Sequence, residues 1–211
     1  MTQGLNRVRI KMCGMTRAND IAHAVSLGVD AIGLIFYEES SRFVSIEQAR
    51  LLCLQDLPAF LNVVAVFVNA ETQFIERVTR ELPIQLLQFH GNETPEFCEQ
   101  FGKPYIKAVP ATSAAALSEV AKQHQHAAAI LLDTPTAHHG GTGQTFDWRI
   151  IPRQLPKPYI LAGGLNVTNV TSALASCSAY AVDVCSGVEA SAGIKDHEKM
   201  DSFVNVLWGK E

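Results

Sequence analysis

The stretch Val8-Arg9-Ile10-Lys11-Met12-Cys13-Gly14-Met15-Thr16 joins a short apolar run to a cysteine and a glycine turn, just ahead of a helix start. Similar apolar runs recur along the chain, and amphipathic stretches of helix length separate most of them. Repeated strand-helix units predict parallel strands, because each return must cross over the sheet. The expected strands are residues 8–12, 31–36, 63–67, 86–89, 105–109, 130–132, 159–162 and 181–184.

Eight such units in 211 residues predict an α/β fold, a (β/α)8 TIM barrel, with residues 1–211 forming a single domain. The strands are nearly continuous apolar runs, which favours a closed barrel covered by helices. An open, doubly wound parallel sheet is the alternative. No Pro/Ser-rich linker, charge block or internal repeat marks a domain boundary.

Cap and stop residues bound the expected helices. Ser45 with Glu47 marks one start, Thr72 another, and Thr94-Pro95 a third, while Asn19-Asp20 precedes the first helix. After the sixth strand the helical signal is weak, and Asp147 is the expected cap of a short helix. The expected helices cover residues 21–27, a stretch from 45 to 52, and residues 74–82, 96–101, 114–124, 148–155, 167–175 and 196–207.

Composition narrows the possible partners and the compartment. The formal net charge of −4 argues against nucleic acid or an anionic membrane as partner, since both attract basic surfaces. The five cysteines are scattered without a CxxC pair, so we expect free thiols in a reducing compartment. Neither a signal peptide nor an apolar run of about 18 residues is evident. These features predict a cytoplasmic protein that binds a small molecule.

Two polar residues end apolar runs at the edge where barrel enzymes build their sites. Cys13 follows the first run and Asp133 the sixth, so a thiol and a carboxylate are expected to face one cavity as base and acid. For Cys13 the alternative is a buried small hydrophobe. For Asp133 it is an ordinary turn residue in Asp133-Thr134-Pro135.

Two further charged residues belong to the first and last strands. Lys11 points to the same face as Cys13, since side chains alternate along a strand, and is placed to favour the thiolate. Asp183 stands inside an apolar run, where an unpaired charge would be costly. It is expected either to pair with Lys11 inside the barrel or to accept hydrogen bonds from substrate hydroxyls.

Glycine turns after the late strands predict a phosphate site. Gly163-Gly164 follows the seventh strand and Ser186-Gly187 the eighth. A third glycine-rich segment, with Gly141 and Gly143, has the composition of a loop that closes over a ligand. Purely structural turns remain the alternative for each segment.

Arg42 lies in the loop after the second strand, where its guanidinium suits a substrate carboxylate; a solvated arginine balancing Glu38 and Glu39 is the alternative. His90, in Gln88-Phe89-His90-Gly91, is expected either to line the same mouth or to be packed. The adjacent pair His138-His139 does not indicate a metal site, because no third ligand is suitably spaced.

These residues together resemble the phosphoribosylanthranilate isomerase family of tryptophan biosynthesis. The resemblance covers nearly the whole chain in order. It is carried by Lys11-Met12-Cys13-Gly14-Met15-Thr16, Gly33-Leu34-Ile35-Phe36-Tyr37 with Ser40, Arg42 and Phe43, Val66-Phe67-Val68-Asn69, Leu87-Gln88-Phe89-His90-Gly91, Leu132-Asp133, Gly140-Gly141-Thr142-Gly143 with Phe146-Asp147-Trp148, Leu161-Ala162-Gly163-Gly164-Leu165, Val182-Asp183-Val184 with Ser186-Gly187-Val188-Glu189, and Gly193, Lys195 and Asp196.

The resemblance implies a cofactor-free Amadori rearrangement of N-(5-phosphoribosyl)anthranilate, with Asp133 as general acid and Cys13 as base. It further implies substrate binding by Lys11, Arg42, Gln88, His90 and Asp183. The phosphate is expected on the backbone at Gly141, Gly143, Gly163, Gly164, Ser186 and Gly187. Four departures from the family pattern are Glu38-Glu39, Ser41, Gln144 and Cys185, the last in place of a frequent serine.

Two other functions compete with this interpretation. One is a related phosphate-binding barrel isomerase or synthase that uses an Asp pair or a catalytic Lys, against which Cys13 argues. The other is a silent phosphosugar-binding barrel, which would be expected to lose Cys13 or Asp133. A monomer is favoured over a dimer, and neither a metal nor a cofactor is expected.

Overall fold

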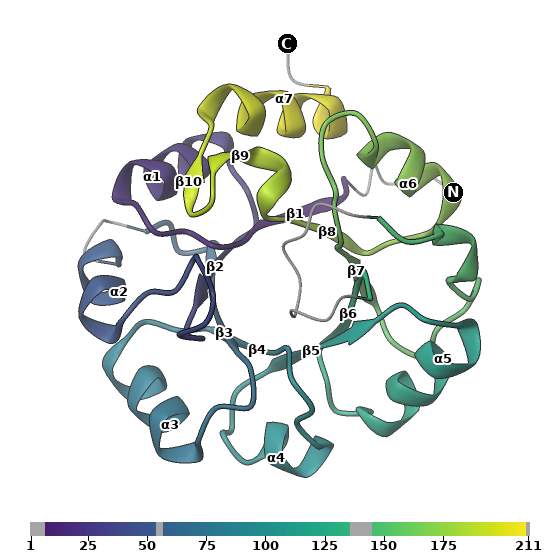
Figure 1. The fold of residues 1–211 in the computed structure, drawn as a ribbon, viewed down its shortest axis with the longest axis horizontal. Coiled ribbons are helices and arrows are strands. Elements are labelled where there is room, and N and C mark those ends of the chain that lie inside the picture. The colour runs from purple at the N-terminus through teal and green to yellow at the C-terminus, as the bar shows by residue number, and fades with distance from the viewer. Residues whose placement is uncertain (1–6, 54–56, 136–144, 210–211) are drawn as a thin grey trace.

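The computed structural model describes residues 7–53, 57–135 and 145–209. Eight parallel strands close into a barrel in sequence order, and helices surround it (Figure 1). The closed barrel confirms the predicted (β/α)8 fold and rules out the open sheet. The strands are β1 (Arg9–Met12), β2 (Ala31–Ile35), β3 (Asn62–Phe67), β4 (Leu86–Phe89), β5 (Tyr105–Pro110), β6 (Ala129–Asp133), β7 (Tyr159–Leu161) and β8 (Ala181–Val184).

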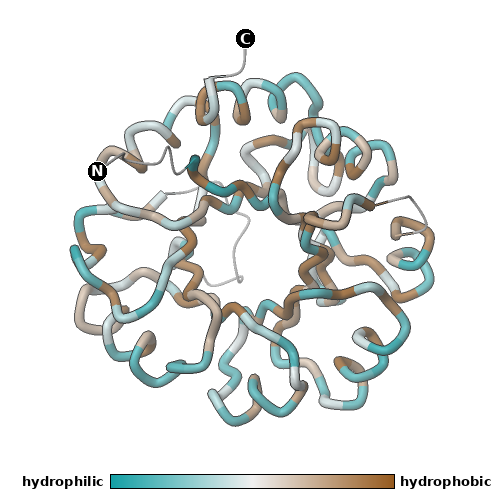
Figure 2. The backbone as a smooth tube through the Cα atoms, turned by 180° about the vertical axis from the view of Figure 1, so that it is seen from behind, coloured by the Kyte–Doolittle hydropathy of each residue, from teal (hydrophilic) through white to brown (hydrophobic). Residues whose placement is uncertain are grey.

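Alternation along the strands divides the core into two layers. One set of side chains packs outward against the helices in the larger apolar cluster, which includes Ile10, Met12 and Leu132. The other set points into the barrel, where Ile106, Leu131 and their neighbours fill the space. Hydrophobic stretches accordingly follow the ring of strands, while the outer turns of the helices are largely hydrophilic (Figure 2). Inward-pointing residues at the carboxyl end of each strand therefore meet at one opening of the barrel, its mouth.

The helices begin and end close to the predicted residues, with local differences. The predicted Ser45 cap is present as a capping box with Gln48. Thr72 is the first residue of its helix and not its cap, because Glu71 takes that position. The first helix starts at Ala18, so Asp20 lies within it. The α-helices are α1 (Ala18–Leu27), α2 (Ile46–Leu52), α3 (Thr72–Glu81), α4 (Pro95–Glu99), α5 (Ala114–Gln123), α6 (Val170–Ser176) and α7 (His197–Trp208).

The connection from β6 to β7 differs most from the prediction. Its described part holds only a short 3-10 turn, η1 (Trp148–Ile150), where a helix over 148–155 was expected. Asp147 does cap this turn, since its side chain accepts a hydrogen bond from the Arg149 amide at 3.0 Å. After β8 the chain forms a second 3-10 turn, η2 (Ser186–Val188), and a small hairpin of β9 (Glu189–Ser191) and β10 (Ile194–Lys195).

The two ends of the chain meet where β1 pairs with β8. In this pairing Lys11 lies beside Asp183 and Met12 beside Val184. Helix α7 covers the seam, and its Trp208 indole donates a hydrogen bond to the Val8 carbonyl at 2.8 Å. Within the described ranges, no helix has the length and apolar character needed to cross a membrane.

Candidate active site

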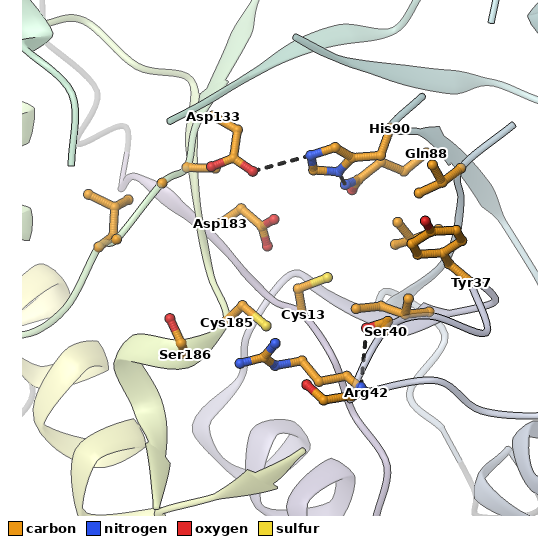
Figure 3. Close-up of a pocket in the computed structure, with 18 of the residues that line it drawn as sticks. Cys13, Tyr37, Ser40, Arg42, Gln88, His90, Asp133, Asp183, Cys185 and Ser186 are labelled. Carbon is orange, nitrogen blue, oxygen red and sulfur yellow. Dashed lines mark hydrogen bonds and ion pairs between the residues drawn. The ribbon is translucent and has the colours of Figure 1, made fainter. Parts of the chain in front are cut away.

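A cavity of about 550 Å³ opens at the carboxyl ends of the barrel strands (Figure 3). This is the end at which barrel enzymes carry out their chemistry. Lys11 and Gly187 are not part of its described lining, and the predicted residues Gly141 and Gly143 lie outside the described ranges. The predicted site residues that line the cavity are Cys13, Arg42, Gln88, His90, Asp133, Gly163, Gly164, Asp183 and Ser186.

A buried ion pair forms the floor of the cavity. Lys11 Nζ lies 3.0 Å from Asp183 Oδ1, as one of the two sequence-based alternatives for Asp183 predicted. Burial raises the pKa of Asp183 to about 7, although Lys11 opposes the shift. Burial also disfavours the charge on Lys11, but Asp183 and Cys13 outweigh it and raise the pKa of Lys11. A permanent positive charge therefore lies beside the Cys13 sulfur.

Cys13 is a thiol whose surroundings favour ionisation. The residue follows β1, is 5% exposed and lines the cavity. A hydrogen bond from Cys185 lowers the pKa of Cys13 well below its usual value, and Lys11 and Lys195 contribute in the same direction against the effect of burial. The partner thiol shows the opposite shift, because donating to Cys13 raises the pKa of Cys185. Of the two thiols, Cys13 is therefore the one that ionises more readily.

Asp133 and two residues of the β4 region form a hydrogen-bonded row on the far side of the cavity (Figure 3). His90 Nε2 lies 3.2 Å from Asp133 Oδ2, and Gln88 Nε2 lies 3.2 Å from His90 Nδ1. Asp133 Oδ1 also accepts from the Thr134 amide at 2.8 Å. These contacts fix the carboxyl group at the strand end, facing the cavity that Cys13 also lines.

Arg42 is held by a carboxylate from the other end of the chain. Its Nε and Nη2 donate to the two oxygens of Glu189 at 2.9 and 2.7 Å. These hydrogen bonds raise the pKa of Arg42 further. Lys195 Nζ also contacts Glu189, at 3.0 Å. The solvated-loop alternative, in which Arg42 balances Glu38 and Glu39, is therefore not the arrangement found.

The turns after β7 and β8 present unused backbone donors. Gly163 and Gly164 both have positive φ, of 81° and 62°, which places the backbone in a conformation that favours glycine. The amides of Gly163, Gly164 and Ser186 form no hydrogen bond with any other described residue. Gly187 instead lets the two turns approach each other, since a Cβ there would lie 1.9 Å from the Leu165 carbonyl oxygen.

Comparison with known proteins decides the family. The sequence model of N-(5'-phosphoribosyl)anthranilate (PRA) isomerase matches residues 10–206. The chain belongs to this family. An N-(5'-phosphoribosyl)anthranilate isomerase of Legionella pneumophila strain Paris is 56% identical over 205 residues, which cover 97% of this chain and 99% of the relative.

Solved structures of the PRA isomerase family agree with this result. Phosphoribosyl anthranilate isomerase from Thermotoga maritima superimposes with a TM-score of 0.88 at 39% identity, covering 96% of this chain and 100% of that one. A second structure, with a TM-score of 0.81 at 35% identity and the same coverage, is a complex with reduced 1-(o-carboxyphenylamino)-1-deoxyribulose 5-phosphate. The resemblance inferred from the sequence motifs is thereby confirmed.

Three polar residues of this PRA isomerase family member were part of quoted motifs but received no role from the sequence. Glu189 orients Arg42, Lys195 lies 4.0 Å from the Cys185 sulfur, and Cys185 donates to Cys13. Glu189 and Lys195 are buried charged residues, and one is positive and one negative. The sequence did contain a signal for this buried pair. Glu189 lies in an apolar, glycine-rich stretch, and Lys195 follows a few positions later.

Metal-binding residue types do not cluster in the described ranges: no group of three or more His, Cys, Asp or Glu side chains there is arranged to hold an ion. The His138-His139 pair lies outside those ranges.

Proposed function

We propose that this protein converts N-(5-phosphoribosyl)anthranilate to 1-(2-carboxyphenylamino)-1-deoxyribulose 5-phosphate, a step of tryptophan biosynthesis. The observation that carries the proposal is the placement of a thiolate-forming Cys13 and a fixed Asp133 on one cavity. The match to the isomerase family along residues 10–206 supports the same substrate.

Substrate binding uses the two charged ends of the molecule. Arg42 keeps Nη1 free of Glu189, and this group is suited to the anthranilate carboxylate. The phosphate is assigned to the unused amides of Gly163, Gly164 and Ser186. The sugar then spans the cavity between these ends, within reach of Asp183. Gln88 and His90 act through Asp133, which they hold in position.

The reaction needs an acid before it needs a base. Asp133, in its protonated form, donates a proton to the ribose ring oxygen, and the ring opens to an iminium ion. The iminium makes the C2 proton acidic, because it accepts the electrons released when that proton leaves. Cys13 removes the C2 proton, and the resulting enol tautomerises to the ketone. No electrons or groups leave the substrate, so we assign no cofactor to the reaction.

The class of substrate, the cellular compartment and the oligomeric state stay predictions. The protein acts on a small phosphorylated molecule in the cytoplasm, a location that its free thiols support. It works as a monomer, which size-exclusion chromatography with light scattering checks.

The decisive experiment measures turnover of N-(5-phosphoribosyl)anthranilate by the purified protein and by two variants. Asp133→Asn keeps the shape but lacks the transferable proton, so kcat should fall about 10² to 10⁴-fold with binding largely kept. In Cys13→Ser, kcat should fall at least as far, and exchange of the C2 proton with solvent deuterium should be lost. Near-normal kcat in Cys13→Ser would contradict the proposal.

A silent phosphosugar-binding barrel is the competing function from another class. Such a protein would bind the substrate analogue without converting the substrate. Binding without turnover by the unmodified chain would favour it.

A further inference from the structure

The two thiols at the mouth of the barrel directly follow the paired strands β1 and β8. The β1–β8 pairing ends with Met12 and Val184, and the amide of the next residue, Cys13, donates to the Val184 carbonyl at 2.9 Å. Cys13 therefore lies beside Cys185. Both follow inward-pointing residues by two positions, Lys11 and Asp183, so both side chains enter the cavity.

This spacing suits a disulfide. Neighbouring strands lie about 4.8 Å apart, and disulfide-linked residues have Cα separations of about 4.4 to 6.8 Å. The Cys185 sulfur also lies close to the turn that follows Cys13, since a Cβ at Gly14 would be 3.0 Å from it. Both cysteines are free thiols in the structure. Closing the bond therefore requires rotation of two side chains and little movement of the backbone.

The surroundings also distinguish this pair from the other cysteines. Cys13 is stabilised as a thiolate by Lys11 and Lys195, and the cavity gives a small solute access to it. Burial raises the pKa of each remaining thiol, Cys53, Cys98 and Cys177, so these are poor nucleophiles. A thiolate beside a second thiol is the arrangement of a peroxide-sensitive site.

We propose that Cys13 and Cys185 form a peroxide-oxidised pair whose disulfide switches the enzyme off reversibly. The Cys13 thiolate attacks one peroxide oxygen, so an S–O bond forms, the O–O bond breaks and hydroxide leaves. The sulfur is oxidised to a sulfenic acid and the peroxide is reduced. Cys185, losing its proton, then attacks this sulfur; the S–S bond forms, the S–O bond of the sulfenic acid breaks, and its oxygen leaves as water. A dithiol reductant restores both thiols.

The expected loss of turnover rests on the proposed function, in which Cys13 is the base. Formation of the disulfide does not depend on that role. A sulfur held in a disulfide has no lone thiolate with which to remove the C2 proton. Cys185 supplies the second function of protecting Cys13, because a sulfenic acid trapped as a disulfide escapes irreversible oxidation to the sulfinic acid.

The test treats the reduced protein with hydrogen peroxide, digests it with trypsin without reductant and identifies crosslinked peptides by mass spectrometry. Residues 12–17 should be joined to residues 154–195 with loss of two hydrogens. The second peptide also contains Cys177, so fragmentation must place the bond on Cys185. Turnover should fall about 100-fold in the crosslinked protein and return with dithiothreitol.

Two variants make the result specific, with activity always compared with each variant's own untreated sample. With excess peroxide, the Cys13 sulfenic acid of Cys185→Ser reacts with a second peroxide and becomes a sulfinic acid, so this variant should be inactivated without a crosslink and should not recover with dithiothreitol. Cys177→Ser, on the same peptide, should behave like the parent. A crosslink through Cys177, or equal recovery of Cys185→Ser, would overturn the inference. Full crosslinking with undiminished turnover would show that the disulfide does not inactivate the enzyme. The turnover of Cys13→Ser tests the proposed function separately.

Discussion

Arg42 has five N–H donors and uses two of them on Glu189, so it is aimed before any substrate arrives. Glu189→Gln can keep only one of the two accepted hydrogen bonds. We expect KM for the phosphoribosylanthranilate substrate to rise about tenfold with little change in kcat, because the contact is the same in the ground and transition states. Steady-state kinetics checks this.

Arg42→Lys is the matched variant, because it keeps the charge but loses the planar fork. It should raise KM as well. Unchanged KM in both variants would place the substrate carboxylate elsewhere in the cavity.

The hydrogen bond from Cys185 to Cys13 predicts a pH dependence. It stabilises the thiolate and so lowers the pKa of Cys13. Cys185→Ala removes the donor, which raises that pKa and leaves less thiolate at neutral pH. The rate of alkylation of Cys13 by iodoacetamide, followed against pH, should shift to higher pH in this variant. Cys185→Ser retains an O–H donor and should shift less. Identical profiles for all three proteins would show that the thiol contact does not control ionisation.

At the scale of elements, the turns after β7 and β8 are locked together at Gly187. An alanine Cβ there would lie 1.9 Å from the Leu165 carbonyl oxygen, so the two turns must separate. Gly187→Ala should cost about 1 to 3 kcal/mol of stability by overpacking. It should also raise KM about tenfold if both turns hold one phosphate.

The control for this variant is Gly102→Ala. Its Cβ meets nothing within 4 Å, although its φ of 62° strains an alanine. Stability should fall while KM stays unchanged. A KM for Gly187→Ala equal to that of the parent would remove the support for a phosphate site at these turns.

The strands were predicted more closely than the helices, for a physical reason. Each strand is a buried apolar run, and polar or turn residues mark its ends, so every boundary falls within one residue of the prediction. The start of α1 was missed because Asp20, a typical cap residue, is buried inside the helix. There it accepts from the Lys195 amide, a partner far along the chain. Local sequence contains no information about such partners.

The same distinction holds for the site. Lys11, Cys13, Asp133 and Asp183 could be placed by strand ends and alternation alone. The partnership of Arg42 with Glu189 could not, because 147 residues separate them, and Arg42 lies in a loop while Glu189 begins the small hairpin after β8. Loop conformation depends on the assembled barrel. Sequence reasoning therefore predicted the residues on strands and missed the contacts between loops.

At the scale of the whole molecule, the barrel is closed by contacts between the two ends of the chain. The Trp208 indole in α7 donates to the Val8 carbonyl. The Arg7 guanidinium carbon lies over the same indole, 4.2 Å from the ring centroid. Trp208→Phe removes the hydrogen bond and also shrinks the ring that faces Arg7, so it should cost at least about 1 kcal/mol of unfolding free energy. Trp208→Ala should cost more. Urea unfolding measures both.

Tyr180 provides the comparison, because it stacks with Arg9 but is 46% exposed. Tyr180→Phe should change stability by less than about 0.5 kcal/mol. If Trp208→Phe were equally neutral, the seam between the chain ends would not depend on this contact.

The ion pair at the floor of the cavity joins residues 172 positions apart in the chain. During translation, Lys11 and Cys13 leave the ribosome long before Asp183 and Cys185 do. Until then the nascent chain has Cys13 without Cys185 and Lys11 without Asp183, and its barrel lacks the eighth strand. Catalytic competence therefore requires β8 to have been made, and a chain stalled before β8 is expected to be inactive however well its earlier strands have folded.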